Sequence, residues 1–373
     1  MADFRESDAQ KGLREKIREF ARDKILPGAA QRDENPSIPV ELIREMGRKG
    51  FLGLIVPGEL GGAGLGCQEF AILVEETARS CAGTAVVVIP HYLVEYAVLT
   101  FGSRQQQLTY LPGLASGEKL AAFAVTESTG GSDVKAFRTK AVRVGEGFRL
   151  QGAKAFINNA SVADVFVAVG KIDEQMTAFL FPGDVSGIRA GQQRDMIGLR
   201  AGAVHDVVFD NCPLKESHIL GEVGHGLSVV LNCMNFGRIG SASIAIGIAE
   251  SALEDALNWA RTREAYGKTL SELPTIRFEL AGMRTELDAA RLLRDRAAWL
   301  NDQDSHHALE TAEAKLKACR VATDIALKAM QIAGAYGCLK GSSFERHLRD
   351  AKAYEIAGGT NEAMKITIAR HLF

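Results

Sequence analysis

The sequence lacks the residue patterns that disulfide-bonded, zinc-binding and nucleic-acid-binding proteins share. Its six cysteines are scattered without a C-x-x-C pair, and its eight histidines show no metal-ligand spacing. We therefore expect reduced thiols, a cytoplasmic location and no metal site. The net charge of −2, from 44 basic and 46 acidic residues, favours neither nucleic acid nor a membrane surface as a partner. We also expect no apolar run long enough to span a bilayer.

What the sequence does have is length and an ordinary core composition. Its 373 residues, 46% hydrophobic and 24% charged, predict a soluble globular protein of two or three domains. Periodicity predicts mainly helices over 1–118, short strands between Gly, Asp and Pro turns over 119–225, and long amphipathic helices over 226–373. We predict an α+β fold with an N-terminal helical domain, a middle β-domain and a C-terminal domain resembling a four-helix bundle.

The expected elements can be placed within these three domains. Expected helices cover 7–26, 39–49, 67–79 and 90–101 in the first domain, and 226–263, 275–301 and 308–335 in the third. Expected strands cover 120–126, 141–144, 148–150, 165–169, 177–181 and 204–209.

Two segments of the β-region combine small hydrogen-bonding residues with glycine or with a turn. They are Ala124–Asp133 (AVTESTGGSD) and Lys154–Asn159 (KAFINN). Glycine permits close approach of the backbone to a ligand, and Ser, Thr and Asn supply donors. Taken alone, the first segment is better explained as a hairpin turn, and an Asn-containing turn stays open for the second.

A third segment, Ala357–Glu362 (AGGTNE), lies close to the C-terminus. Together with the two segments above, it resembles the acyl-CoA dehydrogenase family, whose domain order matches essentially the whole chain. In that family a tyrosine-glutamate-glycine-threonine signature carries the base that removes the α-proton of an acyl thioester, while FAD takes a hydride from the β-carbon. Gly358 stands at the position of that glutamate and is neither acid nor base.

The resemblance implies an FAD site shared between subunits, and hence a homo-oligomer, expected to be a tetramer. Phe156 would keep an apolar cover over the flavin, and Asn158 would replace the usual threonine hydroxyl with an amide. Arg263 would reach the pyrophosphate of a neighbouring subunit's FAD. The implied cofactor residues are Val125, Thr126, Gly131, Ser132, Phe156, Ile157, Asn158, Arg263, Tyr266, Gln331, Gly334, Thr360 and Glu362. The implied acyl-CoA residues are Ser132, Asn235, Arg238 and Gly358.

A second glutamate position known in the family is also empty. It directly precedes an arginine of the first C-terminal helix, which here is Arg238, and its occupant is Gly237. One explanation is a relocated base, as in relatives that form cyclic conjugated dienes with a carboxylate from the N-terminal domain. His91 is then the leading candidate, because imidazole titrates at about 6.5, and Glu95 is a weaker one. This predicts dehydrogenation of an atypical, cyclic or unsaturated acyl-CoA, with electron-transfer flavoprotein as acceptor.

Two further explanations stay open. A sulfinopropionyl-CoA desulfinase branch of the family, which needs no base, also has the sequence Ile-Ala-Gly-Gly-Thr found here at Ile356–Thr360. That branch carries a substrate-binding arginine near the positions of Thr84 and Ala85, and this chain has none there. The last explanation is a non-catalytic, regulatory flavin-binding protein that keeps the fold.

Overall fold

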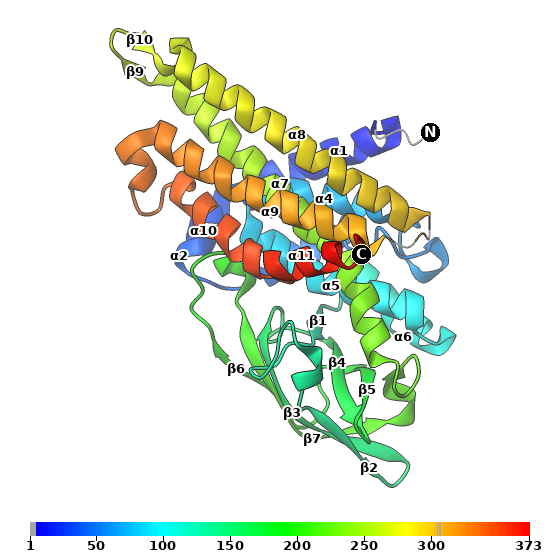
Figure 1. The fold of residues 1–373 in the computed structure, drawn as a ribbon. Coiled ribbons are helices and arrows are strands. Elements are labelled where there is room, and N and C mark those ends of the chain that lie inside the picture. Colours follow the sequence, from blue (N-terminus) through cyan, green and yellow to red (C-terminus); the bar gives the residue numbers. More distant parts are fainter. Residues whose placement is uncertain (1–4, 304, 306) are drawn as a thin grey trace.

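The computed structural model describes residues 5–303, 305 and 307–373, apart from the side chain of Lys135. Helices come first in the chain, a sheet follows, and long helices complete it (Figure 1). The predicted α+β fold, with a β-domain between two helical ones, is confirmed.

The N-terminal part is helical throughout. Its helices are α1 (Asp8–Phe20), α2 (Ala29–Glu34), α3 (Val40–Arg48), α4 (Cys67–Ser80), α5 (Ala82–Phe101) and α6 (Arg104–Ala115). α5 begins eight residues before its predicted start, so Pro90 lies inside the helix rather than ahead of it. Proline disfavours a helix interior, but nearly every side chain of α5 is buried, and this packing outweighs the local preference.

The middle part is one twisted sheet. Its strands are β1 (Ala121–Ala124), β2 (Lys140–Val144), β3 (Gly147–Ile157), β4 (Val165–Ile172), β5 (Gln175–Pro182), β6 (Ile188–Gln193), β7 (His205–Lys215) and β8 (Ile219–Leu220). The strand order is β6-β7-β3-β2-β4-β5-β8, and β1 pairs with β4 in parallel. β6 was not predicted, because it buries no residue and therefore shows no apolar alternation.

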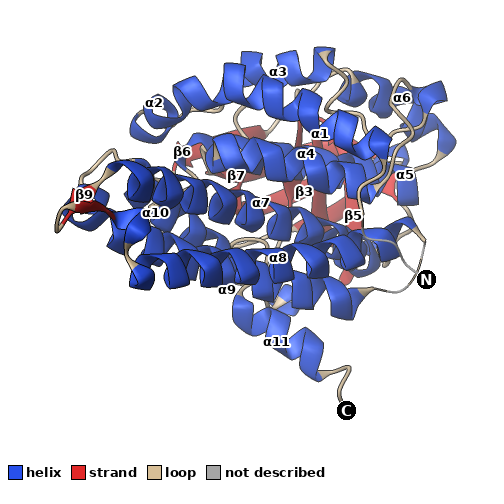
Figure 2. Ribbon diagram, turned by 90° about the horizontal axis from the view of Figure 1, so that it is seen from above, coloured by secondary structure: helices blue, strands red, loops and turns tan. Residues whose placement is uncertain are grey.

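The C-terminal part is a bundle of long helices. They are α7 (Gly226–Thr262), α8 (Pro274–Asp302), α9 (Ala308–Ala333), α10 (Ser343–Ile356) and α11 (Asn361–Ala369), with a small hairpin of β9 (Glu264–Ala265) and β10 (Lys268–Thr269) between α7 and α8. α5 contacts α7 on one side and β1 on another, so it joins the bundle to the sheet. Seen from above, α11 leans away from the bundle (Figure 2).

Two helices, α5 and α7, are long and apolar enough to cross a membrane by length and composition. This corrects the expectation that no apolar run reaches such a length. However, 78% of the apolar window in α5 and 72% of that in α7 are buried inside the protein. Core helices of a globular protein have this composition, because they are covered on all sides.

Candidate functional site

The two glycine- and donor-rich segments of the β-domain lie side by side. The Ala155 amide donates to Thr126 O at 2.8 Å, and Lys154 Nζ donates to Val125 O at 3.1 Å. Lys154 also donates to Glu127 Oε1 at 2.8 Å, and both side chains are buried. Burial lowers the pKa of Lys154 to about 8, against the raising effect of Glu127. The ion pair therefore fixes one predicted flavin segment against the other.

Beyond this pair, the KAFINN segment turns sharply and exposes an aromatic ring. Phe156 has a φ of +58° and is 51% exposed, and the Arg194 guanidinium lies 4.5 Å from its ring centroid. Asn158 Nδ2 donates to Gly202 O at 3.2 Å, in the short 3-10 helix η5 (Arg200–Gly202). A Cβ built on Gly202 would lie 2.4 Å from Val86 Cγ1 of α5. Asn158 thus lies where the sheet meets α5.

The remaining predicted cofactor residues lie elsewhere. Arg263, Tyr266, Gln331 and Gly334 come from the end of α7, the β9–β10 hairpin and the end of α9, and the Arg263 guanidinium lies 5.6 Å from the Tyr336 ring centroid. Figure 1 places this end of the bundle far from the sheet. The last two members stand at the start of α11, where Thr360 caps the helix by accepting from the Ala363 amide at 3.2 Å and Glu362 is exposed. One chain therefore splits the predicted FAD residues between distant places.

Gly358 lies in the turn between α10 and α11, with a φ of +64°. A Cβ built there would lie 2.8 Å from Ser241 Oγ and 3.8 Å from Lys315 Cε. Ser241 in turn donates to Gly237 O at 2.9 Å. The two empty glutamate positions are thus connected through a single serine of α7.

Lys315 is a buried residue near Gly358 that the sequence patterns do not single out. It is fully buried in α9, and its Nζ donates to Tyr354 O at 3.3 Å and to Gly359 O. A lysine in an alanine-rich amphipathic helix is usually a solvated side chain. Its only sequence signal is its place on the helix face with Ala318, Cys319 and Ala322, all of which are buried.

His91 lies between α5 and α6. Its Nε2 is 3.2 Å from Leu114 O of α6 and 3.5 Å from Glu95 Oε1, and its Nδ1 is buried without a partner. Burial raises the pKa of Glu95, against the lowering effect of His91. Both side chains thus belong to the packing between α5 and α6.

The opposite face of α5 meets the helix that carries Gly237. A Cβ built on Gly237 would lie 3.1 Å from Leu93 Cδ2, and one built on Gly240 would lie 2.5 Å from Ile89 Cδ1. In a helix of 3.6 residues per turn, His91 is rotated by about 200° from Ile89. His91 therefore faces α6, whereas Ile89 and Leu93 face α7, and the role of His91 as the relocated base stays a prediction.

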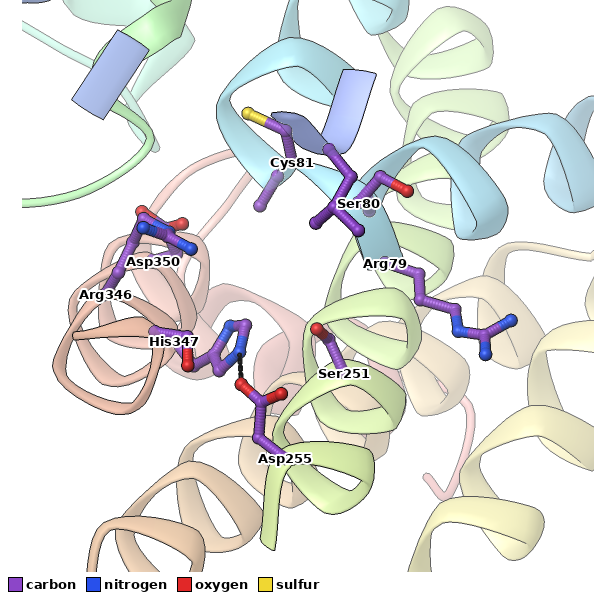
Figure 3. A pocket seen from close by; sticks show the side chains of 12 residues that line it. Arg79, Ser80, Cys81, Ser251, Asp255, Arg346, His347 and Asp350 are labelled. Carbon is purple, nitrogen blue, oxygen red and sulfur yellow. Dashed lines mark hydrogen bonds and ion pairs between the residues drawn. The ribbon is translucent and has the colours of Figure 1, made fainter. Parts of the chain in front are cut away.

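A separate cavity of about 90 Å³ lies where the α4–α5 junction meets α7 and α10 (Figure 3). Its lining includes Cys81, Ser251, Asp255, His347 and Asp350, and His347 Nε2 lies 3.1 Å from Asp255 Oδ2. No predicted cofactor or substrate residue lines it. We therefore do not assign it to the functional site.

Asp350→Asn is expected to stabilise the protein at neutral pH. The buried Asp350 carboxylate accepts from the Leu199 amide at 2.6 Å, and burial raises its pKa from 3.8 to about 6. The Asp350 carboxyl is protonated in both the folded and the unfolded chain below pH 3.8, and its contribution to the free energy of unfolding is then complete. This contribution is lost as the pH rises through 6. Its neutral replacement should thus gain about 2–3 kcal/mol above pH 6, with the gain vanishing below pH 4. Chemical unfolding across this range measures it, and a gain independent of pH would contradict it.

Three family models match successive parts of the chain. They describe the N-terminal, middle and C-terminal domains of acyl-CoA dehydrogenase and match residues 7–118, 122–212 and 224–373. The human mitochondrial short-chain specific acyl-CoA dehydrogenase is 39% identical over 366 residues, which are 96% of this chain and 89% of that protein.

Solved structures agree with this similarity along the entire chain. Butyryl-CoA dehydrogenase from Megasphaera elsdenii is 31% identical, with a TM-score of 0.97 and full coverage of both chains. A chain from a structure described as the electron transferring flavoprotein of Acidaminococcus fermentans is 32% identical, with a TM-score of 0.98 and full coverage of both.

Proposed function

The chain belongs to the acyl-CoA dehydrogenase family, and from this we propose that it dehydrogenates an atypical acyl thioester with a relocated catalytic base, because no glutamate stands at position 358 or 237. Its relatives are oxidoreductases that act on CH–CH groups, and FAD is its cofactor. The observation that carries the proposal is the link from Gly358 through Ser241 to Gly237. Both glutamate positions thus share one wall, and neither carries a carboxylate.

The described residues fit an FAD site in two halves. The paired segments around Thr126 and Phe156 would hold the flavin ring, since the Phe156 side chain is half exposed and a Cβ built on Gly131 would meet nothing closer than Thr126 Cγ2 at 3.7 Å. When bound, FAD supplies hydride acceptance. The residues around Arg263 and Gly334 lie at the end of the bundle away from the sheet, and we propose that a second copy of the chain provides them. A homotetramer and electron transfer to electron-transfer flavoprotein complete the proposal.

The acyl group that this site would accept is compact. Ile89 and Leu93 fill the space opposite Gly240 and Gly237, which leaves little length for a chain between α5 and α7. The short-chain relatives support this. A branched, cyclic or unsaturated group fits the proposal better than a long straight chain.

His91→Ala is expected to lower the free energy of unfolding by about 1–3 kcal/mol, because a buried hydrogen bond to Leu114 O is lost. Flavin reduction by the native substrate should change by less than about threefold, since the ring faces α6. Urea unfolding and anaerobic stopped-flow absorbance measure the two effects. A stable variant with reduction slowed about 100-fold or more would instead support His91 as the relocated base.

An anaerobic screen of flavin reduction tests the proposed function. Straight-chain, branched, cyclic and dicarboxylic thioesters of CoA are mixed with the FAD-loaded oligomer, and products are weighed by mass spectrometry. A product lighter by two hydrogens supports dehydrogenation. Loss of sulfite or carbon dioxide would favour the lyase alternative, and the absence of reduction by any thioester would favour the regulatory one.

A further inference from the structure

Lys315 lies beside Gly358, and a second largely buried cation, Arg238, is near enough to Lys315 to lower its pKa. Lys315 reaches two backbone carbonyls from α9, as described above. Arg238, on α7, donates from Nη1 to Asn235 Oδ1 at 3.0 Å, while its Nε is buried without a partner. Among the described residues, the hydrogen-bond acceptors of both cations are thus neutral oxygen atoms.

No carboxylate of the described residues forms an ion pair with either cation. Within the part of the chain that the structure describes, neither Arg238 nor Lys315 has a carboxylate oxygen within 4.0 Å. The charge of Glu355 raises the pKa of Lys315 from a distance. The Glu355 carboxylate itself accepts hydrogen bonds from Lys352 Nζ at 2.7 Å and from Thr323 Oγ1 at 2.6 Å. Burial lowers the pKa of Arg238, and burial together with Arg238 lowers that of Lys315.

Other buried cations of this protein are paired with carboxylates. Arg294 is 1% exposed and lies 2.6 Å from Glu75 Oε2, and buried Lys154 lies 2.8 Å from Glu127. A buried charge without a partner is costly, so an unpaired cation at a protein site is a good partner for an anion from elsewhere. Gly358, whose Cβ position would lie 3.8 Å from Lys315 Cε, places no side chain of its own beside that lysine.

We propose that Arg238 and Lys315 form an oxyanion subsite beside Gly358, which binds a second anionic group on the acyl chain of the substrate. The substrate class is then an acyl thioester that carries a carboxylate or a related oxyanion. A guanidinium and an ammonium together suit such a group, because they supply directed donors as well as charge. This inference rests on the proposed function, since the ligand is the acyl part of the same thioester.

Isothermal titration of two matched thioesters tests the subsite. Succinyl-CoA and butyryl-CoA have four acyl carbons and the same CoA, and differ in the terminal carboxylate. They are titrated anaerobically into the FAD-loaded oligomer, with the flavin reduced beforehand so that no hydride is transferred. We expect succinyl-CoA to bind about 10- to 100-fold more tightly. Arg238→Gln and Lys315→Met should each reduce this ratio to below about threefold, whereas Arg320→Gln, which removes an exposed cation of α9, should leave it unchanged.

The outcomes separate the subsite from the proposed function. Equal affinity of the wild type for the two thioesters, or an undiminished ratio in Arg238→Gln, would refute the oxyanion subsite. If Lys315→Met does not fold, the wild-type ratio and Arg238→Gln still decide. Failure of both thioesters to bind would instead contradict the proposed function itself.

Discussion

Gly358→Glu is expected to raise α,β-dehydrogenation of butyryl-CoA by about 10²- to 10⁴-fold, the range that a positioned general base contributes. The new carboxylate would stand where the family's base stands and would remove the α-proton as the hydride leaves. Anaerobic single-turnover reduction of the flavin measures the rate. Gly358→Gln is the matched control, because it has the same shape but cannot accept the proton.

The site opposes this substitution in two ways. A φ of +64° costs a residue other than glycine about 1–2 kcal/mol, and the new Cβ would lie 2.8 Å from Ser241 Oγ. Combining Gly358→Glu with Ser241→Ala removes the contact and should give the larger gain. The new carboxylate would also occupy the pair formed by Arg238 and Lys315, so the preference for succinyl-CoA should disappear. Equal rates for the Glu and Gln variants would contradict the account of the missing base.

Lys154→Met is expected to lower the free energy of unfolding by about 3–5 kcal/mol, because it leaves Glu127 buried without its cation. It should also weaken FAD binding, since Lys154 joins the segment around Phe156 to Val125 O. Guanidinium unfolding followed by circular dichroism and FAD titration followed by flavin fluorescence measure these effects.

The double variant Glu127→Gln/Lys154→Met provides the control for this ion pair. Its unfolding free energy should recover at least half of the loss, because no buried charge is left unpaired. A single variant within about 1 kcal/mol of the wild type would show that the pair contributes little. A double variant no more stable than the single one would point instead to lost packing against Phe137, whose ring centroid lies 4.8 Å from Lys154 Nζ.

The sequence was sufficient to predict the helices and strands whose buried residues recur at a regular spacing. The strongly apolar strand at Val165–Ile172 and the long bundle helices begin and end within a few residues of their predicted bounds. It was insufficient where tertiary packing overrides local preference. Burial keeps α5 helical through Pro90, and β6 is almost wholly solvent-facing. The local sequence therefore predicts neither the start of α5 nor the presence of β6.

For the site, motif matching located glycines and flavin segments but not side-chain directions. His91 and Ile89 are two residues apart, yet they face opposite sides of α5, and only the packing of α5 between α6 and α7 shows which helix each side chain meets. Lys315 lies 43 residues from Gly358 in the sequence, and the two approach each other only through the packing of α9 on the turn before α11. Such long-range pairs have no single-sequence signal.

The rate at which butyryl-CoA reduces the flavin of the wild-type oligomer, under anaerobic single-turnover conditions, tests the central claim most directly. The account predicts reduction at least about 100-fold slower than in Gly358→Glu combined with Ser241→Ala, because neither glutamate position carries a base. Wild-type reduction as fast as in that variant would contradict it and would show that ordinary dehydrogenation proceeds without either carboxylate.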